Sequence, residues 1–206
     1  QLKQTPQSVD SVTVQAGAHY KRGPLYRLFW GRRHRYAWTA PVTVPVLNLD
    51  TTRGGLSVEK IGGGMQTVNA TMGGGDGLVY SLRTVDKRPA VKLPPLVRKT
   101  IAADLVRDQT SALHPYAALV VAPLANAAAV PTPSPRLVYV KPNDERLGEH
   151  KELLSDRLYL LEEKFTDKRG LIGSLSGGYD IISTKKMLSN RFTHDNHFID
   201  HIAYAK

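Results

Sequence analysis

Clusters of glycine divide the stretch between residues 54 and 85 into short segments, and this spacing constrains the fold more than any other feature. The clusters are Gly54-Gly55, Gly62-Gly63-Gly64, and Gly73-Gly74-Gly75 with Gly77. Segments rich in β-branched and long apolar residues occupy 56–61, 65–72 and 78–85, and the last of them alternates cleanly between its two faces. Glycine turns between such segments predict three strands in an antiparallel meander.

Downstream of this meander the pattern changes to helices and then back to strands. Val97, Ile101 and Leu105 recur every fourth residue after Pro95, which suits the first turn of a helix. An alanine-rich stretch predicts a second helix, which Pro123 should bend or divide. This second helix should span 116–130. The elements that we expect after it are a stiff proline connector at 131–135, strands at 136–140 and 158–161, and helices at 181–190 and 197–206. This order predicts an α+β fold.

Composition restricts the classes of protein. The chain has no cysteine, which excludes disulfides, zinc–thiolate sites and cysteine nucleophiles. No apolar run approaches the ~18 residues of a membrane span, and the first residues contain no targeting segment. Because the chain begins with Gln1, we expect a fragment of a longer protein. We expect a basic and aromatic lead-in segment at 1–50, a domain at 51–165 and the start of a helical region at 166–206.

The positive charge is concentrated in the lead-in segment. The chain has a net charge of +10, and residues 11–49 contain no aspartate or glutamate. Within residues 19–38, basic side chains alternate with tyrosine, phenylalanine and tryptophan. Aromatics beside cations are typical of a single-strand nucleic-acid binder, but the aromatics can equally pack on the domain while the cations stay in solvent. We favour packing, or docking on an anionic lipid surface or a partner domain, over nucleic acid, since no nucleic-acid motif accompanies the segment.

Several residues occur in the order needed to hold a nucleotide. A Gly62-Gly63-Gly64 turn can bring backbone N–H groups close to phosphates. Lys87, at the end of the third predicted strand, is a candidate phosphate contact, and Arg83 is a second candidate cation that should share its face by alternation. Asp108, which we place in the middle of the next helix, could hold that lysine by an ion pair, as in kinases. Glu162 and Glu163 close an apolar strand and would form a hinge whose backbone meets an adenine edge.

These segments resemble those of a family of Bacteroidetes envelope proteins. The resemblance covers roughly residues 19–206 and is carried by four stretches: 62–67 (GGGMQT), 81–87 (SLRTVDK), 108–118 (DQTSALHPYAA) and 160–163 (LLEE). In that family the region looks like an atypical kinase-like domain, related to HipA-type and secreted kinases. It often sits between a calcineurin-like metallophosphoesterase domain and an outer-membrane β-barrel. The resemblance implies a protein-kinase-like N-lobe, an ATP and magnesium site, a cell-envelope location, and the C-terminal lobe of the same polypeptide as a partner.

The chain departs from that family in one respect. The family continues into a Gly-Asp-Trp-Asp-Arg-His segment that looks like the catalytic loop, and this sequence has no such segment. We therefore expect no catalytic residue here and no phosphotransferase activity from this fragment alone. His194, His197 and His201 have a spacing that zinc could accept, but their polar neighbours favour a solvated helix, so we expect no metal site. The ligand motifs of a metallophosphoesterase are also absent.

Overall fold

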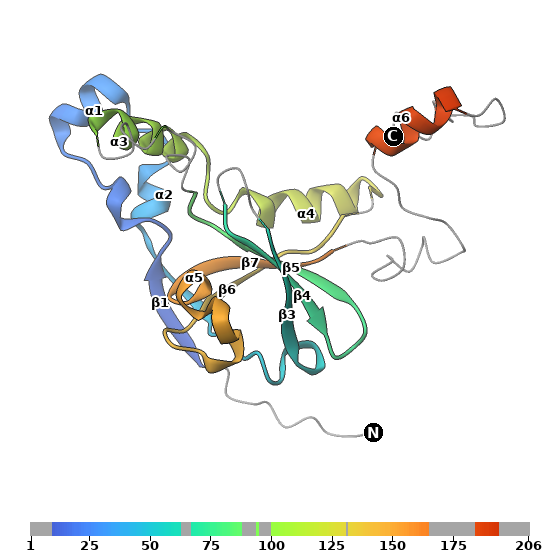
Figure 1. The fold of residues 1–206 in the computed structure, drawn as a ribbon. Coiled ribbons are helices and arrows are strands. Elements are labelled where there is room, and N and C mark those ends of the chain that lie inside the picture. Colours follow the sequence, from blue (N-terminus) through green and yellow to red (C-terminus); the bar gives the residue numbers. More distant parts are fainter. Residues whose placement is uncertain are drawn as a thin grey trace.

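The structure of the chain is a computed structural model that describes residues 10–62, 67–87, 94, 100–130, 132–164 and 184–193. It contains antiparallel sheets and several helices, which confirms the α+β prediction (Figure 1). The predicted helix at 197–206 lies outside the described residues, as do Gly63 and Gly64.

The main sheet has five strands in the order β3-β4-β5-β7-β6, and every neighbouring pair is antiparallel. Its strands are β3 (Leu56–Gly62), β4 (Asn69–Gly74), β5 (Val79–Thr84), β6 (Arg136–Val140) and β7 (Arg157–Glu163). The predicted three-strand meander and the two later strands are therefore confirmed. β7 returns to lie beside β5, so the last two strands extend the same sheet.

Close backbone packing explains part of the glycine pattern. The turn between β4 and β5 packs directly on residue Gly54, and a Cβ on Gly75 would collide with the carbonyl oxygen of Gly54. Gly54 has a positive φ of 75°, which most residues with a side chain avoid. Two of the glycine clusters thus serve the folding of the sheet itself.

A second, two-stranded sheet comes from the lead-in segment. β1 (Ser11–Gln15) pairs antiparallel with β2 (Pro41–Pro45). Beyond β2, Val46 forms a bridge with Tyr139 of β6, which joins this two-stranded sheet to the edge of the main sheet. Pro41 and Pro45 bracket a short apolar stretch that predicts an extended segment through Leu49, and β2 lies within it; its partner β1 was not predicted.

The helices are short, apart from α3, α4 and α6. The elements are η1 (Ala18–Tyr20), α1 (Pro24–Trp30), α2 (Arg35–Thr39), η2 (Thr52–Gly54), α3 (Ile101–Asp108), η4 (Gln109–Ala112), α4 (Ala117–Ala127), η5 (Glu145–His150), α5 (Lys151–Leu154) and α6 (Thr184–Thr193). The second predicted helix is confirmed as α4. Helix α4 continues through Pro123 as one helix. Proline has no backbone N–H, so it removes one hydrogen bond of the helix, and this loss does not end the helix.

Hydrophobic cores cover both faces of the sheet. On one face, Leu47 and Leu49 pack with Leu147 and Leu154 against the strands. On the other, the core is formed by Ala16, Tyr20, Trp38, Val44, Val85, Leu158 and Leu160. The lead-in segment supplies residues to both cores, so it packs on the sheet instead of standing apart from it.

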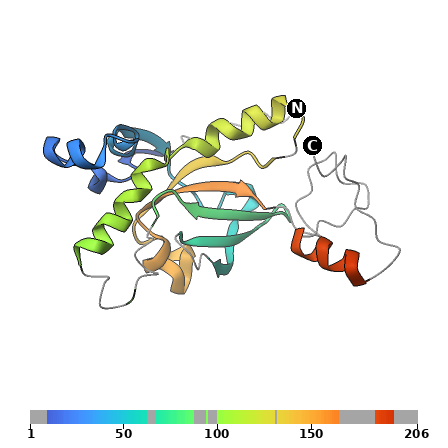
Figure 2. The ribbon, with the colours of Figure 1, turned by 90° about the horizontal axis from the view of Figure 1, so that it is seen from above.

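Helix α4 covers only part of the second face. Its residues Ala118 and Leu119 pack with Leu137 of β6 and Leu160 of β7. Figure 2 shows α4 running along the β6 side of the sheet, away from β3 and β4. The portion of this face formed by β4, β5 and the end of β7 carries polar side chains instead.

Candidate functional site

The polar portion of the sheet face is defined by strand register. Asn69 lies opposite Arg83, and Thr71 lies opposite Ser81. Ser81 in turn lies opposite Glu162 on β7. Because residues opposite each other in a sheet share a face, these side chains form one row, which we call the polar strip: Asn69, Thr71, Ser81, Arg83, Glu162 and Lys164.

Hydrogen bonds between strands order the polar strip. The guanidinium of Arg83 donates through Nη2 to Oε1 of Glu162 at 2.6 Å. The hydroxyl of Ser81 lies 3.0 Å from Oδ1 of Asn69, to which it donates. The ammonium of Lys164 donates to Oγ1 of Thr71 at 3.0 Å. The side chain of Arg83 is still 49% exposed, so a ligand can reach the rest of its guanidinium.

The hairpin that begins at Gly62 starts beside the polar strip. Gly62 is the last residue of β3 and lies opposite Asn69, which is itself opposite Arg83. A Cβ on Gly62 would lie 3.8 Å from the carbonyl oxygen of Asn69, an ordinary contact distance. Among the residues that the structure describes, packing therefore does not require glycine at position 62, in contrast to Gly75.

Glu162 and Glu163 close β7 as the sequence predicted, and they differ in their surroundings. Glu162 lies in the polar strip, whereas Glu163 is opposite Tyr80 and on the other face. The pairing of β7 with β6 ends at Leu161. Glu162 and Glu163 thus pair with β5 alone, and within the described residues no strand occupies their second backbone edge.

The structure separates Lys87 from the regular alternation of β5. The strand ends at Thr84, and bends at residues 85 and 86 precede Lys87. Alternation therefore does not fix the face on which Lys87 lies, because the chain leaves the extended conformation after Thr84, and the shared face of Arg83 and Lys87 stays a prediction. Arg83 is the cation that the sheet itself places in the polar strip.

The proposed pairing of Asp108 with Lys87 is corrected by the structure. Asp108 is the last residue of α3, not its middle, and is only 2% exposed. Its carboxylate accepts two hydrogen bonds from Arg35, Nη1 to Oδ1 at 2.6 Å and Nη2 to Oδ2 at 2.5 Å, and a third from Nε of Arg22 at 3.4 Å. Arg35 is 73 positions away in the sequence, which explains why spacing gave no hint of this pair.

A second carboxylate also ties the lead-in segment to the sheet. Asp86, just after β5, accepts a hydrogen bond from the hydroxyl of Tyr20 at 2.9 Å and one from Nη2 of Arg107 at 3.3 Å. Nε2 of His19 lies 3.8 Å from the same carboxylate. Burial, followed by the charge of Asp86, raises the pKa of Tyr20 well above its usual value. The tyrosine therefore stays a hydrogen-bond donor at neutral pH.

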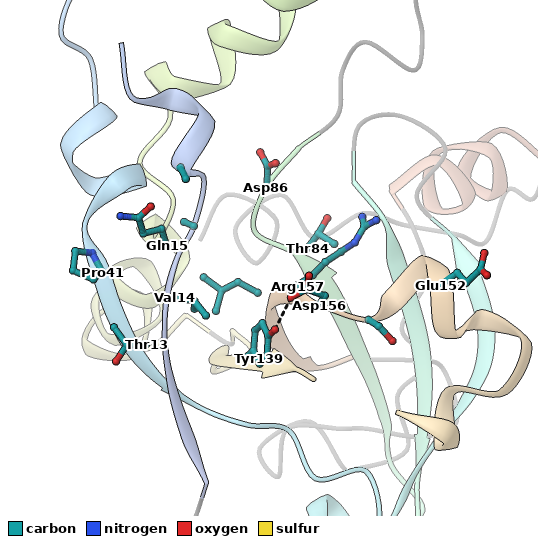
Figure 3. A pocket seen from close by; sticks show the side chains of 14 residues that line it. Thr13, Val14, Gln15, Pro41, Thr84, Asp86, Tyr139, Glu152, Asp156 and Arg157 are labelled. Atoms are coloured by element: carbon teal, nitrogen blue, oxygen red, sulfur yellow. Dashed lines mark hydrogen bonds between the residues drawn. The ribbon is translucent and has the colours of Figure 1, made fainter. Parts of the chain in front are cut away.

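A cavity of about 830 Å³ lies between β1 and the start of β7 (Figure 3). Its wall includes the acidic side chains of Asp86, Glu152 and Asp156, and the hydroxyl of Tyr139 donates to Asp156 at 2.5 Å. Burial and that hydrogen bond raise the pKa of Tyr139 to about 12. None of the predicted site residues that the structure describes lines this cavity. Arg157 also lines the cavity, but the three carboxylates outnumber this cation and disfavour a phosphate ligand, so the polar strip is the better nucleotide candidate.

The Asp108–Arg35 pair gives a prediction for pH. Burial by itself would raise the pKa of Asp108, but the hydrogen bonds and charge of Arg35 outweigh it and hold that pKa below its ordinary value. The stability from this group is therefore fully present above the unfolded pKa of about 3.9 and is lost as pH falls through the lower folded pKa. We expect the free energy of unfolding, measured with urea, to fall as the pH drops below about 4. Arg22→Ala removes only the longest of the three hydrogen bonds to Asp108, so this variant should keep the pH dependence. If the free energy of unfolding of Asp108→Asn fell equally steeply with pH, the pH dependence could not be assigned to Asp108.

Comparison with known protein families, curated proteins and solved structures finds no match to this chain. Within the described ranges, no group of three or more histidine, aspartate or glutamate side chains is placed to hold a metal ion. No helix in that part of the chain is long and apolar enough to cross a membrane.

Proposed function

We propose that this chain is the nucleotide-binding half of an atypical kinase-like domain, and that it binds the phosphates of ATP on the polar strip. The observation that carries the proposal is the Arg83–Glu162 ion pair on an accessible sheet face, next to the hairpin that begins at Gly62. A cell-envelope location and a C-terminal lobe as partner belong to the same proposal, and they rest on the family resemblance.

The order of elements supports this proposal. The sequence pattern predicts a glycine turn after the first strand, helices after the third, and two further strands, and the resemblance implies that such a module is a protein-kinase-like N-lobe. In the chain, the Gly62 hairpin joins β3 to β4, α3 and α4 follow β5, and β6 and β7 complete the sheet. Elements in this order bring the first hairpin and the end of β7 to the two sides of β5.

The chemistry of the polar strip suits a polyphosphate. Arginine offers several N–H donors in a planar fork, and Glu162 occupies only part of that fork on Arg83. Lys164 lies in the same strip, and Lys60 of β3 is opposite Thr71. The single carboxylate of the strip already pairs with Arg83, so we expect Mg²⁺ to be bound mainly by the phosphates and water, as is usual for this ion.

The end of β7 suits an adenine ring. A purine edge presents a hydrogen-bond donor and acceptors, which backbone groups complement. Glu162 and Glu163 have one backbone edge paired with β5 and lack a strand on the other within the described chain. The hinge role predicted for these two residues therefore falls to their backbone, while the carboxylate of Glu162 orients Arg83.

We expect Arg83→Ala to weaken the binding of Mg-ATP by about 10- to 100-fold, the loss typical for a hydrogen bond to a charged group. Isothermal titration calorimetry on the full chain measures this change. Arg136→Ala is the matched control, because Arg136 is an exposed arginine of the same sheet that lies opposite Leu161, on the other face. Absence of ATP binding by the unmodified chain, or equal weakening by both variants, would refute the site.

Two further variants separate the parts of the proposed site. Gly62→Val should preserve stability, because the described neighbours of Gly62 leave room for a side chain, yet it should reduce ATP affinity by crowding the polar strip. Lys87→Ala tests the cation predicted from sequence. If Lys87→Ala reduces affinity while Arg83→Ala does not, the phosphates lie at the end of β5 and not on the strip.

A further inference from the structure

Helix α1 presents an apolar face to solvent. Leu25, Leu28 and Phe29 are each 76% exposed. Their i, i+3, i+4 spacing places them on one side of the helix. No residue of α1 is buried. A contiguous apolar face of this kind marks an interaction surface rather than part of a core.

A strongly basic hollow adjoins α1, which contributes Arg27 to its lining. It has a volume of about 370 Å³ and is lined by Lys21, Arg22, Arg27, Arg32, Arg33, Arg35, Tyr36 and Thr39. Arg22 and Arg35 are neutralised by Asp108. Among the described residues, no carboxylate lies within ion-pair distance of the other four cations of the hollow, and Arg27 belongs to both the hollow and α1.

We propose that α1 and the basic hollow dock on the surface of an anionic lipid bilayer. The apolar face of Leu25, Leu28 and Phe29 enters the boundary between headgroups and acyl chains, as amphipathic interfacial helices do. The four cations without a carboxylate partner pair with anionic headgroups, which attract basic segments close to the membrane. The segment 11–49 itself contains no acidic residue that would repel such a surface.

The aromatic contacts favour a bilayer over single-stranded nucleic acid. Base stacking needs exposed ring faces. The ring of Tyr26 is stacked on Trp30 at 4.9 Å between centroids, and the guanidinium carbons of Arg22 and Arg35 lie 4.9 and 5.4 Å from its centroid. Two of the three most exposed apolar side chains of α1 are leucines, which insert into lipid but offer no stacking platform.

Vesicle co-sedimentation of the full chain tests this proposal. We expect binding to vesicles of phosphatidylcholine and phosphatidylserine at roughly 7:3, and little binding to phosphatidylcholine alone. Neutralising three cations should weaken binding about 100-fold, since each basic residue near an anionic surface contributes about fivefold. That variant combines Arg27→Gln, Arg32→Gln and Arg33→Gln. A second variant, which combines Leu25→Ser, Leu28→Ser and Phe29→Ser, should reduce binding to background.

Two control variants test whether vesicle binding depends on this surface or only on the total charge and hydrophobicity of the chain. The charge control combines Arg136→Gln, Lys141→Gln and Lys151→Gln; the apolar control combines Val120→Ser, Val121→Ser and Leu124→Ser, all exposed positions of α4. Both controls should bind vesicles like the unmodified chain. Absence of vesicle binding, equal losses in the controls, or binding to a single-stranded oligonucleotide without vesicle binding would each overturn the proposal. Self-association that the Leu25, Leu28 and Phe29 variant abolishes, without vesicle binding, would overturn it as well.

Discussion

Replacing Asp108 by alanine should lower the free energy of unfolding by about 3–5 kcal/mol, the usual cost of removing one partner of a buried ion pair. Arg35 is only 4% exposed and would keep its charge without the carboxylate that now accepts two of its hydrogen bonds. Among the described residues, the remaining hydrogen-bond acceptors of Arg35 are the backbone oxygens of Gly31 and Tyr20, at 3.3 and 3.4 Å. These long contacts cannot replace a carboxylate. Urea denaturation followed by circular dichroism measures the loss.

The control for this variant lies on the same helix. Asp104 is an exposed acid in the first turn of α3, so Asp104→Ala makes the same change of charge without exposing a buried partner. It should cost less than about 1 kcal/mol, the upper range for a charge near an exposed helix end. The double variant Asp108→Leu with Arg35→Met should recover much of the stability, because a buried pair can often be replaced by apolar residues. Similar losses for Asp104→Ala and Asp108→Ala would show that the ion pair does not hold α2 to α3.

Trp38→Ala is the second variant for which we expect a large effect, a loss of about 3–5 kcal/mol. Trp38 is 1% exposed and packs against Tyr20, with 4.7 Å between ring centroids. Its indole N–H donates to the carbonyl oxygen of Leu113 at 2.8 Å. The substitution leaves a large cavity between the lead-in segment and the sheet and also leaves that carbonyl without its donor.

The other tryptophan provides the comparison. Trp30 is 41% exposed and stacks on Tyr26, so Trp30→Ala should change the free energy of unfolding by less than about 1 kcal/mol. The two variants should have opposite effects in thermal denaturation and in vesicle binding. Trp38→Ala should reduce thermal stability, whereas Trp30→Ala should leave stability intact and weaken vesicle binding. Equal stability of both variants would contradict the buried position of Trp38.

The lead-in segment contains residues that pack on the sheet and residues for which we propose lipid docking, and its sequence did not distinguish the two sets. Some of its aromatic and basic residues hold the segment on the sheet: Tyr20 and Trp38 enter the core, and Arg35 pairs with Asp108. Others remain at the surface, where α1 and its neighbouring cations form the proposed lipid-binding face. The packing and docking interpretations of this segment therefore apply to different residues within it.

The predicted nucleotide site divides in a similar way. Gly62, Arg83 and Glu162 lie on β3, β5 and β7 of one sheet, with Asn69 of β4 between Gly62 and Arg83, and the glycine turns and the returning strand set this order. Asp108 does not join them, because its carboxylate pairs with Arg35 of α2 instead. Lys87 falls beyond the end of β5, where alternation no longer fixes the direction of a side chain.

The sequence alone determined the elements and their class, because strand alternation, glycine turns and helical spacing are local properties that a few neighbouring residues impose. From these it could place three strands in a meander and put Arg83 and Ser81 on one face of β5. Only the tertiary structure decided which carboxylate meets which cation, since Asp108 and Arg35 are 73 residues apart and their contact depends on how the lead-in segment packs. It also decided that Gly54 and Gly75 serve close backbone packing, whereas Gly62 meets no such close contact within the described residues, because that difference depends on what lies opposite each Cα and not on the glycine itself.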